Sequence, residues 1–141
     1  MATKPRRARR QPTTQQRGLA EAISGVQKTL DDPSPRVRDK AVRALGEALA
    51  PLLSREATRL ARETGVDLRD AEAEMLAAAW EASLAFDESK GVYPAHYMGS
   101  RYGKLPSARI TATRRHQRWR ERHHFVDQDG LEALANESGE G

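Results

Sequence analysis

The chain has 141 residues, enough for one small domain with tails but not for a large two-domain enzyme. It contains no cysteine, which excludes disulfide scaffolds, thiolate metal sites and cysteine nucleophiles and is compatible with a reducing compartment. No apolar run approaches the length that spans a bilayer, and the N-terminus lacks the apolar core of a signal peptide. We therefore expect a cytoplasmic protein with no membrane partner.

The net charge of +4 is distributed along the chain in blocks of opposite sign. Residues 1–17 carry +6 and residues 101–124 carry +7, whereas residues 18–100 carry −4 and residues 125–141 carry −5. Two strongly basic blocks on a small protein favour a polyanionic partner, and nucleic acid is the preferred one.

The N-terminal third is predicted to contain a basic arm followed by two helices. Residues 1–17 have almost no apolar side chains to bury, so we expect them to form a disordered arm. A helical pair is expected over residues 18–50, where Ser34 and Pro35 form a start signal for the second helix and Pro51 a stop signal. The apolar stripe of the first helix consists of Leu19, Ile23, Val26 and Leu30.

Two further helices are predicted in the middle of the chain. One covers residues 52–64 and is followed by Gly65, which suits the left-handed conformation that ends many helices. The other covers residues 68–86, with Asp67 as its N-cap. Apolar residues surround most of this segment, so we expect it to be the central, mostly buried helix.

The C-terminal part is predicted to hold a short helix, a basic helix and an acidic tail. Pro94 can open the short helix, and Pro106 is expected to interrupt it and open the basic helix, which reaches about His124. Residues 125–141 are expected to be a frayed acidic tail. Because no segment alternates as a strand does, the sequence predicts an all-α compact helical bundle, with residues 51–124 as its main domain.

Residues 67–105 read DLRDAEAEMLAAAWEASLAFDESKGVYPAHYMGSRYGKL. This segment resembles region 2 of the sigma-70 family of bacterial transcription initiation factors. The family has a helix that starts with a D-L-x-Q-E pattern and ends in Phe-Asp, then a turn with glycine and an aromatic residue in the next helix. Trp80, Phe86-Asp87, Gly91 and Tyr97 match these positions without a gap. With the preceding helix, which is similar to region 2.1, the likeness covers about residues 52–124.

The resemblance implies a DNA-binding transcription initiation factor that is not an enzyme and needs no cofactor. In the family, carboxylates on one face of the conserved helix dock on core RNA polymerase, and this role falls on Asp70 and Glu74. Region 4, which reads the upstream promoter element, has no counterpart in this sequence. The overall arrangement is similar to reduced or split sigma factors, including phage ones, in which a second protein supplies the region 4 function.

The basic block is expected to contact promoter DNA of the minus-ten region, including an unpaired non-template strand. Aromatic faces stack on unpaired bases while guanidinium groups bind phosphates, and here the two residue types alternate. Tyr97 corresponds to a family aromatic that contacts the minus-ten element. The predicted DNA-binding residues are Tyr93, Tyr97, Arg101, Tyr102, Lys104, Arg109, Arg114, Arg115, Arg118, Trp119 and Arg122.

Other interpretations remain open at this point. Asp70 and Glu74 could simply keep an alanine-rich helix hydrated, and the tyrosines could complete the core. A metal site among His116, His123 and His124 is disfavoured, because surrounding arginines oppose a cation. Two alternative functions are a small helical nucleic-acid-binding assembly protein and an inhibitor that occupies the sigma site of RNA polymerase.

Overall fold

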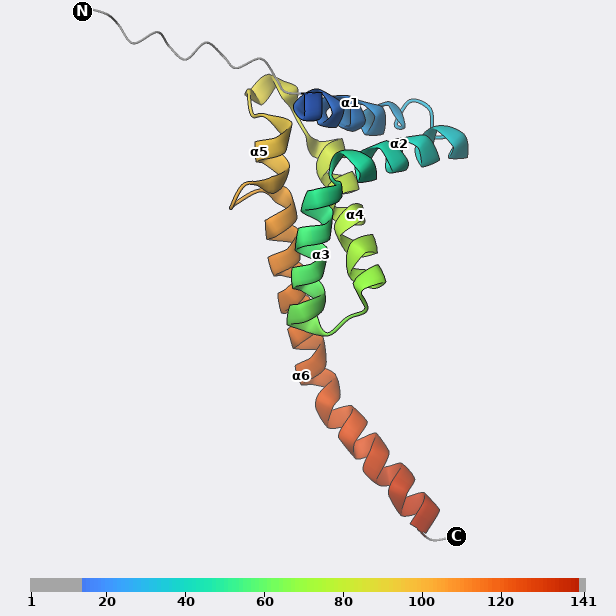
Figure 1. Cartoon of the computed structure of the whole chain (residues 1–141). Helices are drawn as coiled ribbons and strands as arrows, with labels where there is room; N and C mark the ends of the chain where they lie inside the picture. Colours follow the sequence, from blue (N-terminus) through green and yellow to red (C-terminus); the bar gives the residue numbers. More distant parts are fainter. Residues whose placement is uncertain (1–13, 140–141) are drawn as a thin grey trace, which may run out of the picture.

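Helices make up almost all of the described chain, which comprises residues 14–139, with side chains described for residues 17–123. Figure 1 shows the computed structural model, a helical bundle from which the last helix projects. No strand occurs within residues 14–139, so the predicted all-α bundle is confirmed. The elements are α1 (Thr14–Lys28), α2 (Pro35–Ala48), α3 (Ala50–Thr64), α4 (Leu68–Ala85), the short 3₁₀ helix η1 (Glu88–Lys90), α5 (Pro94–Gly99) and α6 (Lys104–Gly139).

Four of the prolines that the structure describes lie in the first turn of a helix, where a missing N–H has no cost. Pro35 is the first residue of α2. Pro51 lies in the first turn of α3, and Leu49 alone separates the two helices, so the break comes just before the proline. Pro106 similarly lies in the first turn of α6, while the interruption expected there falls at residues 100–103.

The connection between α3 and α4 follows the local signals in the sequence. Gly65 has φ 75°, and its N–H donates to the Ala61 carbonyl over 2.8 Å. The side chain of Asp67 accepts a hydrogen bond of 2.8 Å from the Arg69 N–H and so caps α4. Both predictions are confirmed, and together they make α3 and α4 neighbouring helices joined by a tight turn.

Helix α4 is the central helix of the bundle, as its composition predicts. It contacts α1, α2, α3 and α6, and its inner face is fully shielded from solvent at Ala71, Met75 and Ala79. One cluster of buried residues extends from Leu19 in α1 to Ala112 in α6. Small alanines on α4 let the surrounding helices approach closely, which positions α6 directly against α3 and α4.

Two helix boundaries differ from the sequence-based expectations. α1 begins at Thr14, inside the stretch predicted to be a disordered arm, and ends before Leu30, which is 70% exposed. α6 continues to Gly139 instead of ending near His124. In α1, the good helix formers Gln15, Gln16 and Arg17 extend a helix that packing already nucleates. The outer part of α6 contains weak helix formers such as Gly130 and Asn136, so it continues a helix nucleated by the packing of its first turns and not by its own propensity. Residues 1–13, which hold most of the predicted arm, lie outside the described residues.

Helix α6 has a packed part and a projecting part. Leu105, Arg109 and Ala112 are buried against the bundle, whereas residues 117–122 are exposed on every side. With 36 residues the helix is about 54 Å long. Figure 1 shows its second half running away from the other helices.

Candidate nucleic-acid and protein interfaces

An aromatic and basic cavity lies at the corner between α5 and α6. It measures about 350 Å³ and is lined by His96, Tyr97, Ser100, Arg101, Tyr102, Gly103 and Lys104. The corner is tight, because a side chain at Gly103 would come within 2.8 Å of the Met98 carbonyl oxygen. Only glycine therefore permits the turn that presents Arg101 and Tyr102 at the mouth of the cavity.

Four of the predicted DNA-binding residues come together in this cavity. The Tyr102 ring is 83% exposed, and the Arg101 guanidinium lies 5.6 Å from its centroid. The Lys104 ammonium lies 5.6 Å from the centroid of the Tyr97 ring. Each aromatic ring is thus paired with a cation, an arrangement that suits a stacked base with its phosphate nearby.

Tyr97 serves as the fixed wall of the cavity. Its hydroxyl donates to the Ala82 carbonyl over 2.9 Å, and its ring meets Phe86 edge to face at 5.0 Å. Burial raises the pKa of the Tyr97 hydroxyl above its ordinary value. The ring therefore helps to complete the core and also faces Lys104, while its predicted contact with DNA stays a prediction.

Tyr93 lies outside the cavity between α5 and α6. It is 51% exposed and lines a different cavity, of about 650 Å³, between α1 and the segment that leads into α5. Glu21 and Glu88 also line that cavity, with Arg17 as its one cationic residue. Two carboxylates beside Tyr93 disfavour a phosphate there, and the structure does not bring Tyr93 together with the other predicted aromatics.

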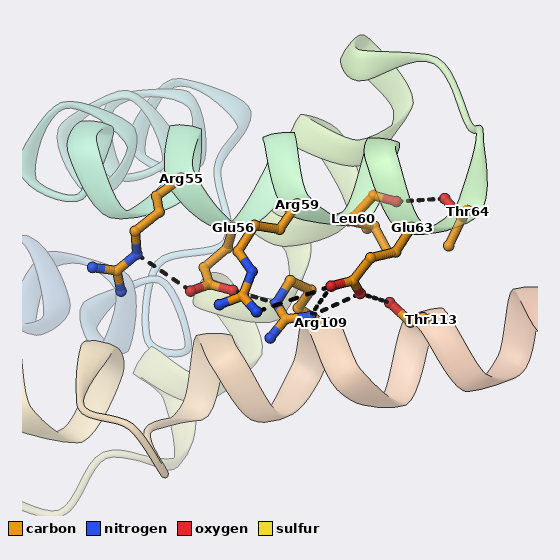
Figure 2. A network of polar contacts seen from close by, with 8 residues as sticks. All are labelled: Arg55, Glu56, Arg59, Leu60, Glu63, Thr64, Arg109 and Thr113. Atoms are coloured by element: carbon orange, nitrogen blue, oxygen red, sulfur yellow. Dashed lines mark hydrogen bonds and ion pairs between the residues drawn. The ribbon is translucent and has the colours of Figure 1, made fainter.

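The expectation that Arg109 contacts DNA is corrected by its burial. Its side chain is 7% exposed, and its Nε donates to Glu56 Oε2 over 2.6 Å. Its Nη1 donates to both carboxylate oxygens of Glu63, which also accepts from the Thr113 hydroxyl over 2.9 Å. Figure 2 shows this network between α3 and α6. With its charge neutralised inside the protein, Arg109 fixes helix packing and is unavailable to phosphate.

Glu56 and Glu63 are the carboxylates that hold Arg109, and the sequence interpretation missed both. Glu56 is 1% exposed, although it belongs to a residue type that is rarely buried unless paired. The sequence could have indicated this burial, because Glu56 lies three residues after Leu53 and four before Leu60, on the apolar face of α3. Arg109 lies four residues after Leu105 and three before Ala112 on the packed face of α6, so two charged residues interrupt two facing apolar stripes.

Glu74 is also engaged within the molecule. Its carboxylate forms an ion pair with the Arg115 guanidinium, and its Oε2 lies 3.3 Å from His116 Nε2. The Glu74 side chain is 26% exposed and that of Arg115 is 67% exposed. The structure therefore joins one predicted polymerase-binding residue to one predicted DNA-binding residue, across the contact between α4 and α6.

Asp70 differs from Glu74, although both lie on the same face of α4. It is exposed in the first turn of the helix, and no other described side chain forms an ion pair with it. A carboxylate at this end of a helix is favoured by the helix dipole and needs no partner from within the fold. Asp70 thus remains accessible to a cationic partner.

Three of the predicted arginines form an exposed stripe on the projecting part of α6. Arg114, Arg118 and Arg122 are spaced by four residues, which places them about 6 Å apart along one side of the helix. None of the three forms an ion pair with another described side chain. We call Arg114, Arg118 and Arg122 the arginine stripe.

The neighbouring side of α6 carries Trp119. This residue is 56% exposed, and its ring stacks on His123 with the centroids 4.3 Å apart. The His123 ring nitrogen Nδ1 lies 2.8 Å from the Trp119 carbonyl, which holds the imidazole in place. The pair forms an exposed aromatic platform next to the arginine stripe.

Comparisons with protein-family models, curated proteins and solved structures gave no match for this chain. None of the helices described in the structure is both long and apolar enough to cross a membrane. Among the described side chains, no group of three histidine, aspartate or glutamate residues is placed to hold a metal ion. The surfaces that bear on function are therefore the basic one, formed by the α5–α6 cavity and the arginine stripe, and the acidic one around Asp70 on α4.

Proposed function

We propose that this chain is a DNA-binding transcription initiation factor, a sigma-like subunit that binds core RNA polymerase and contacts promoter DNA of the minus-ten region. The observation that carries the proposal is the cavity between α5 and α6, where two tyrosines and two cations converge. The arginine stripe begins about 15 Å further along α6. The resemblance to sigma region 2 expects a contact with the minus-ten element at Tyr97, and the alternation of aromatic and basic residues predicts DNA contacts at Arg101, Tyr102 and Lys104.

DNA binding is supported by two surfaces with different chemistry: the α5–α6 cavity offers a ring for stacking, and the arginine stripe offers cations for phosphates. Tyr102 offers an exposed ring for stacking, which is worth about 1–3 kcal/mol per base. The arginine stripe offers three cations in a row, which suits successive phosphates and carries no sequence information by itself. DNA would follow α6 and place an unstacked base at the α5–α6 corner.

The polymerase half of the proposal is supported by Asp70. This carboxylate is exposed on the central helix, on a different side of α4 from the buried residues, and is available to an arginine or lysine of a partner helix. Glu74 would bind the same partner helix after releasing Arg115.

A pull-down with core RNA polymerase, followed by in vitro transcription, tests the proposal. Asp70→Arg should abolish co-purification because it places a cation where the partner also has one, while circular dichroism shows unchanged helicity. Glu72→Arg is the matched control: it makes the same charge change on the same helix, about 200° around its axis from Asp70. Equal binding by the wild type and Asp70→Arg would exclude this docking face.

The second candidate, a helical nucleic-acid-binding assembly protein, is favoured by one observation. Glu74, half of the predicted docking pair, is already paired with Arg115 and His116. Footprinting on promoter and random DNA, with and without core polymerase, separates the candidates. Sequence preference that needs polymerase supports the initiation factor, whereas identical protection of both DNAs supports the assembly protein. Repression in the transcription assay would identify an inhibitor.

A further inference from the structure

The contact between Glu74 and α6 joins the two surfaces on which the proposed function depends. Glu74 lies one helical turn after Asp70 on α4, and Arg115 lies beside Arg114 at the start of the projecting part of α6. The Glu74 carboxylate uses one oxygen for Arg115 and the other for His116. A partner helix that needs this carboxylate and a phosphate that needs this guanidinium would each have to break the same ion pair.

We infer that the Glu74–Arg115/His116 ion pair is an autoinhibitory contact that couples the two surfaces, so that binding on either one exposes a charged group for the other. The inference rests on the proposed function for the identity of the two partners. The coupling arises because Glu74 and Arg115 can each exchange the other for an external partner. A cation from the polymerase takes over Glu74 and frees Arg115 for phosphate, and a phosphate that takes Arg115 frees Glu74 in return.

The strength of the ion pair sets the size of this coupling. Arg115 is two-thirds exposed, and such a pair contributes modestly to stability because water and salt screen it. Coupling between two sites is reciprocal, so each partner should raise the affinity of the other by the same factor. From the usual strength of exposed pairs, we expect a factor of about two to five.

The pair also differs from the other ion pairs of α6 in being breakable. Arg109 is held by two carboxylates in a buried network, and its release would require α3 and α6 to separate. Arg115 can instead turn away from Glu74 without any movement of the helices, because most of its side chain is already in solvent. Exchange at Glu74 is therefore compatible with an unchanged fold.

The first test measures binding of the full chain to a fluorescent single-stranded oligonucleotide by anisotropy at several salt concentrations. Glu74→Gln should bind about two to five times more tightly than the wild type, and its affinity should fall more steeply with salt because Arg115 becomes available. Glu72→Gln is the matched control, since it removes the same charge from a residue that does not contact α6. In an Arg115→Gln/His116→Gln background, the gain from Glu74→Gln should disappear.

The second test uses the opposite side of the contact. Arg115→Gln should raise the affinity for core polymerase by a similar factor, because it frees Glu74. Arg118→Gln, which removes a charge from the arginine stripe without touching α4, should not. Thermal unfolding of each variant checks that the bundle is intact, and this second test remains informative if Glu74→Gln loses stability.

The outcomes separate the inference from the proposed function. Equal gains for Glu74→Gln and Glu72→Gln, or a gain that persists without Arg115 and His116, would overturn the coupling alone. Unchanged polymerase affinity in Arg115→Gln would do the same. Failure of the wild type to bind the oligonucleotide or the polymerase would overturn the proposed function and the coupling with it.

Discussion

The two halves of α6 use the same residue type in opposite ways. In the packed half, Arg109 is enclosed by Glu56 and Glu63 and holds α6 against α3. In the projecting half, Arg114, Arg118 and Arg122 lie in solvent without a described acidic partner. The contrast teaches that a run of arginines is not one functional unit, because burial and nearby carboxylates decide which of them can meet a phosphate.

The largest expected effect comes from the packed half. Arg109→Gln should lower the free energy of unfolding by about 3–5 kcal/mol, because it leaves the buried Glu56 carboxylate without a counter-charge. Arg118→Gln should change it by no more than about 0.5 kcal/mol, as exposed substitutions usually do. Chemical denaturation of the two variants measures the difference, and similar values would contradict the contrast.

The next effect belongs to the projecting half. Replacing Arg114, Arg118 and Arg122 together by glutamine should weaken oligonucleotide binding on the order of a hundredfold at low salt, since each lost attraction is worth about 1 kcal/mol in water. The slope of affinity against salt should fall by about two.

The control for this triple variant is Arg36→Gln/Lys40→Gln/Arg43→Gln, which removes an exposed row of three cations from α2. Its binding should stay close to that of the wild type. If both triple variants lose affinity equally, net charge alone drives binding and the arginine stripe has no special role.

A smaller effect distinguishes the two exposed tyrosines. Tyr102→Ala should cost about 1–3 kcal/mol of single-strand binding, because its ring is expected to stack on a base. Tyr93→Ala should leave binding unchanged, since Tyr93 lines the cavity with Glu21 and Glu88. Anisotropy titrations compare the two variants, and a loss in Tyr93→Ala would place nucleic acid across both cavities.

The smallest effect concerns Tyr97. Tyr97→Phe removes the hydrogen bond to the Ala82 carbonyl and should cost about 1 kcal/mol of stability near neutral pH. Burial raises the pKa of this hydroxyl above its ordinary value of 10.0, so the unfolded chain ionises first. The wild type should therefore lose stability as the pH rises above about 10 more steeply than Tyr97→Phe does. Parallel denaturation curves at alkaline pH measure this, and equal slopes would argue that the ring is solvated.

Local signals made much of the fold predictable from the sequence. The left-handed Gly65 and the Asp67 cap depend on a few neighbouring residues, and both are found where the sequence indicates. The predicted end of α6 near His124 was wrong, because a helix that packing has already nucleated can continue without an apolar stripe, even through a weak helix former such as Gly130.

Residues of the candidate site that share a short segment lie together in the structure, whereas the contacts between distant helices could not be predicted from the sequence. Tyr97, Arg101, Tyr102 and Lys104 lie within eight residues, so one tight corner brings them together. Arg109 and Arg115 find their acidic partners on α3 and α4, more than forty residues away in the chain. Composition alone could not distinguish these two arginines from the arginine stripe.

Because α6 is long, a small change of angle where it packs on the bundle produces a large displacement of its far end. Residues 117–139 span about 34 Å beyond the packed part, so a tilt of about 10° there would swing the far end by about 6 Å. A pull on the outer part acts first on the nearest contacts, which join Arg115 and His116 to Glu74. It acts next on the contacts that Arg109 and Thr113 form with α3. The stiffness of these contacts with α3 and α4 decides how precisely the bundle orients the outer part of α6.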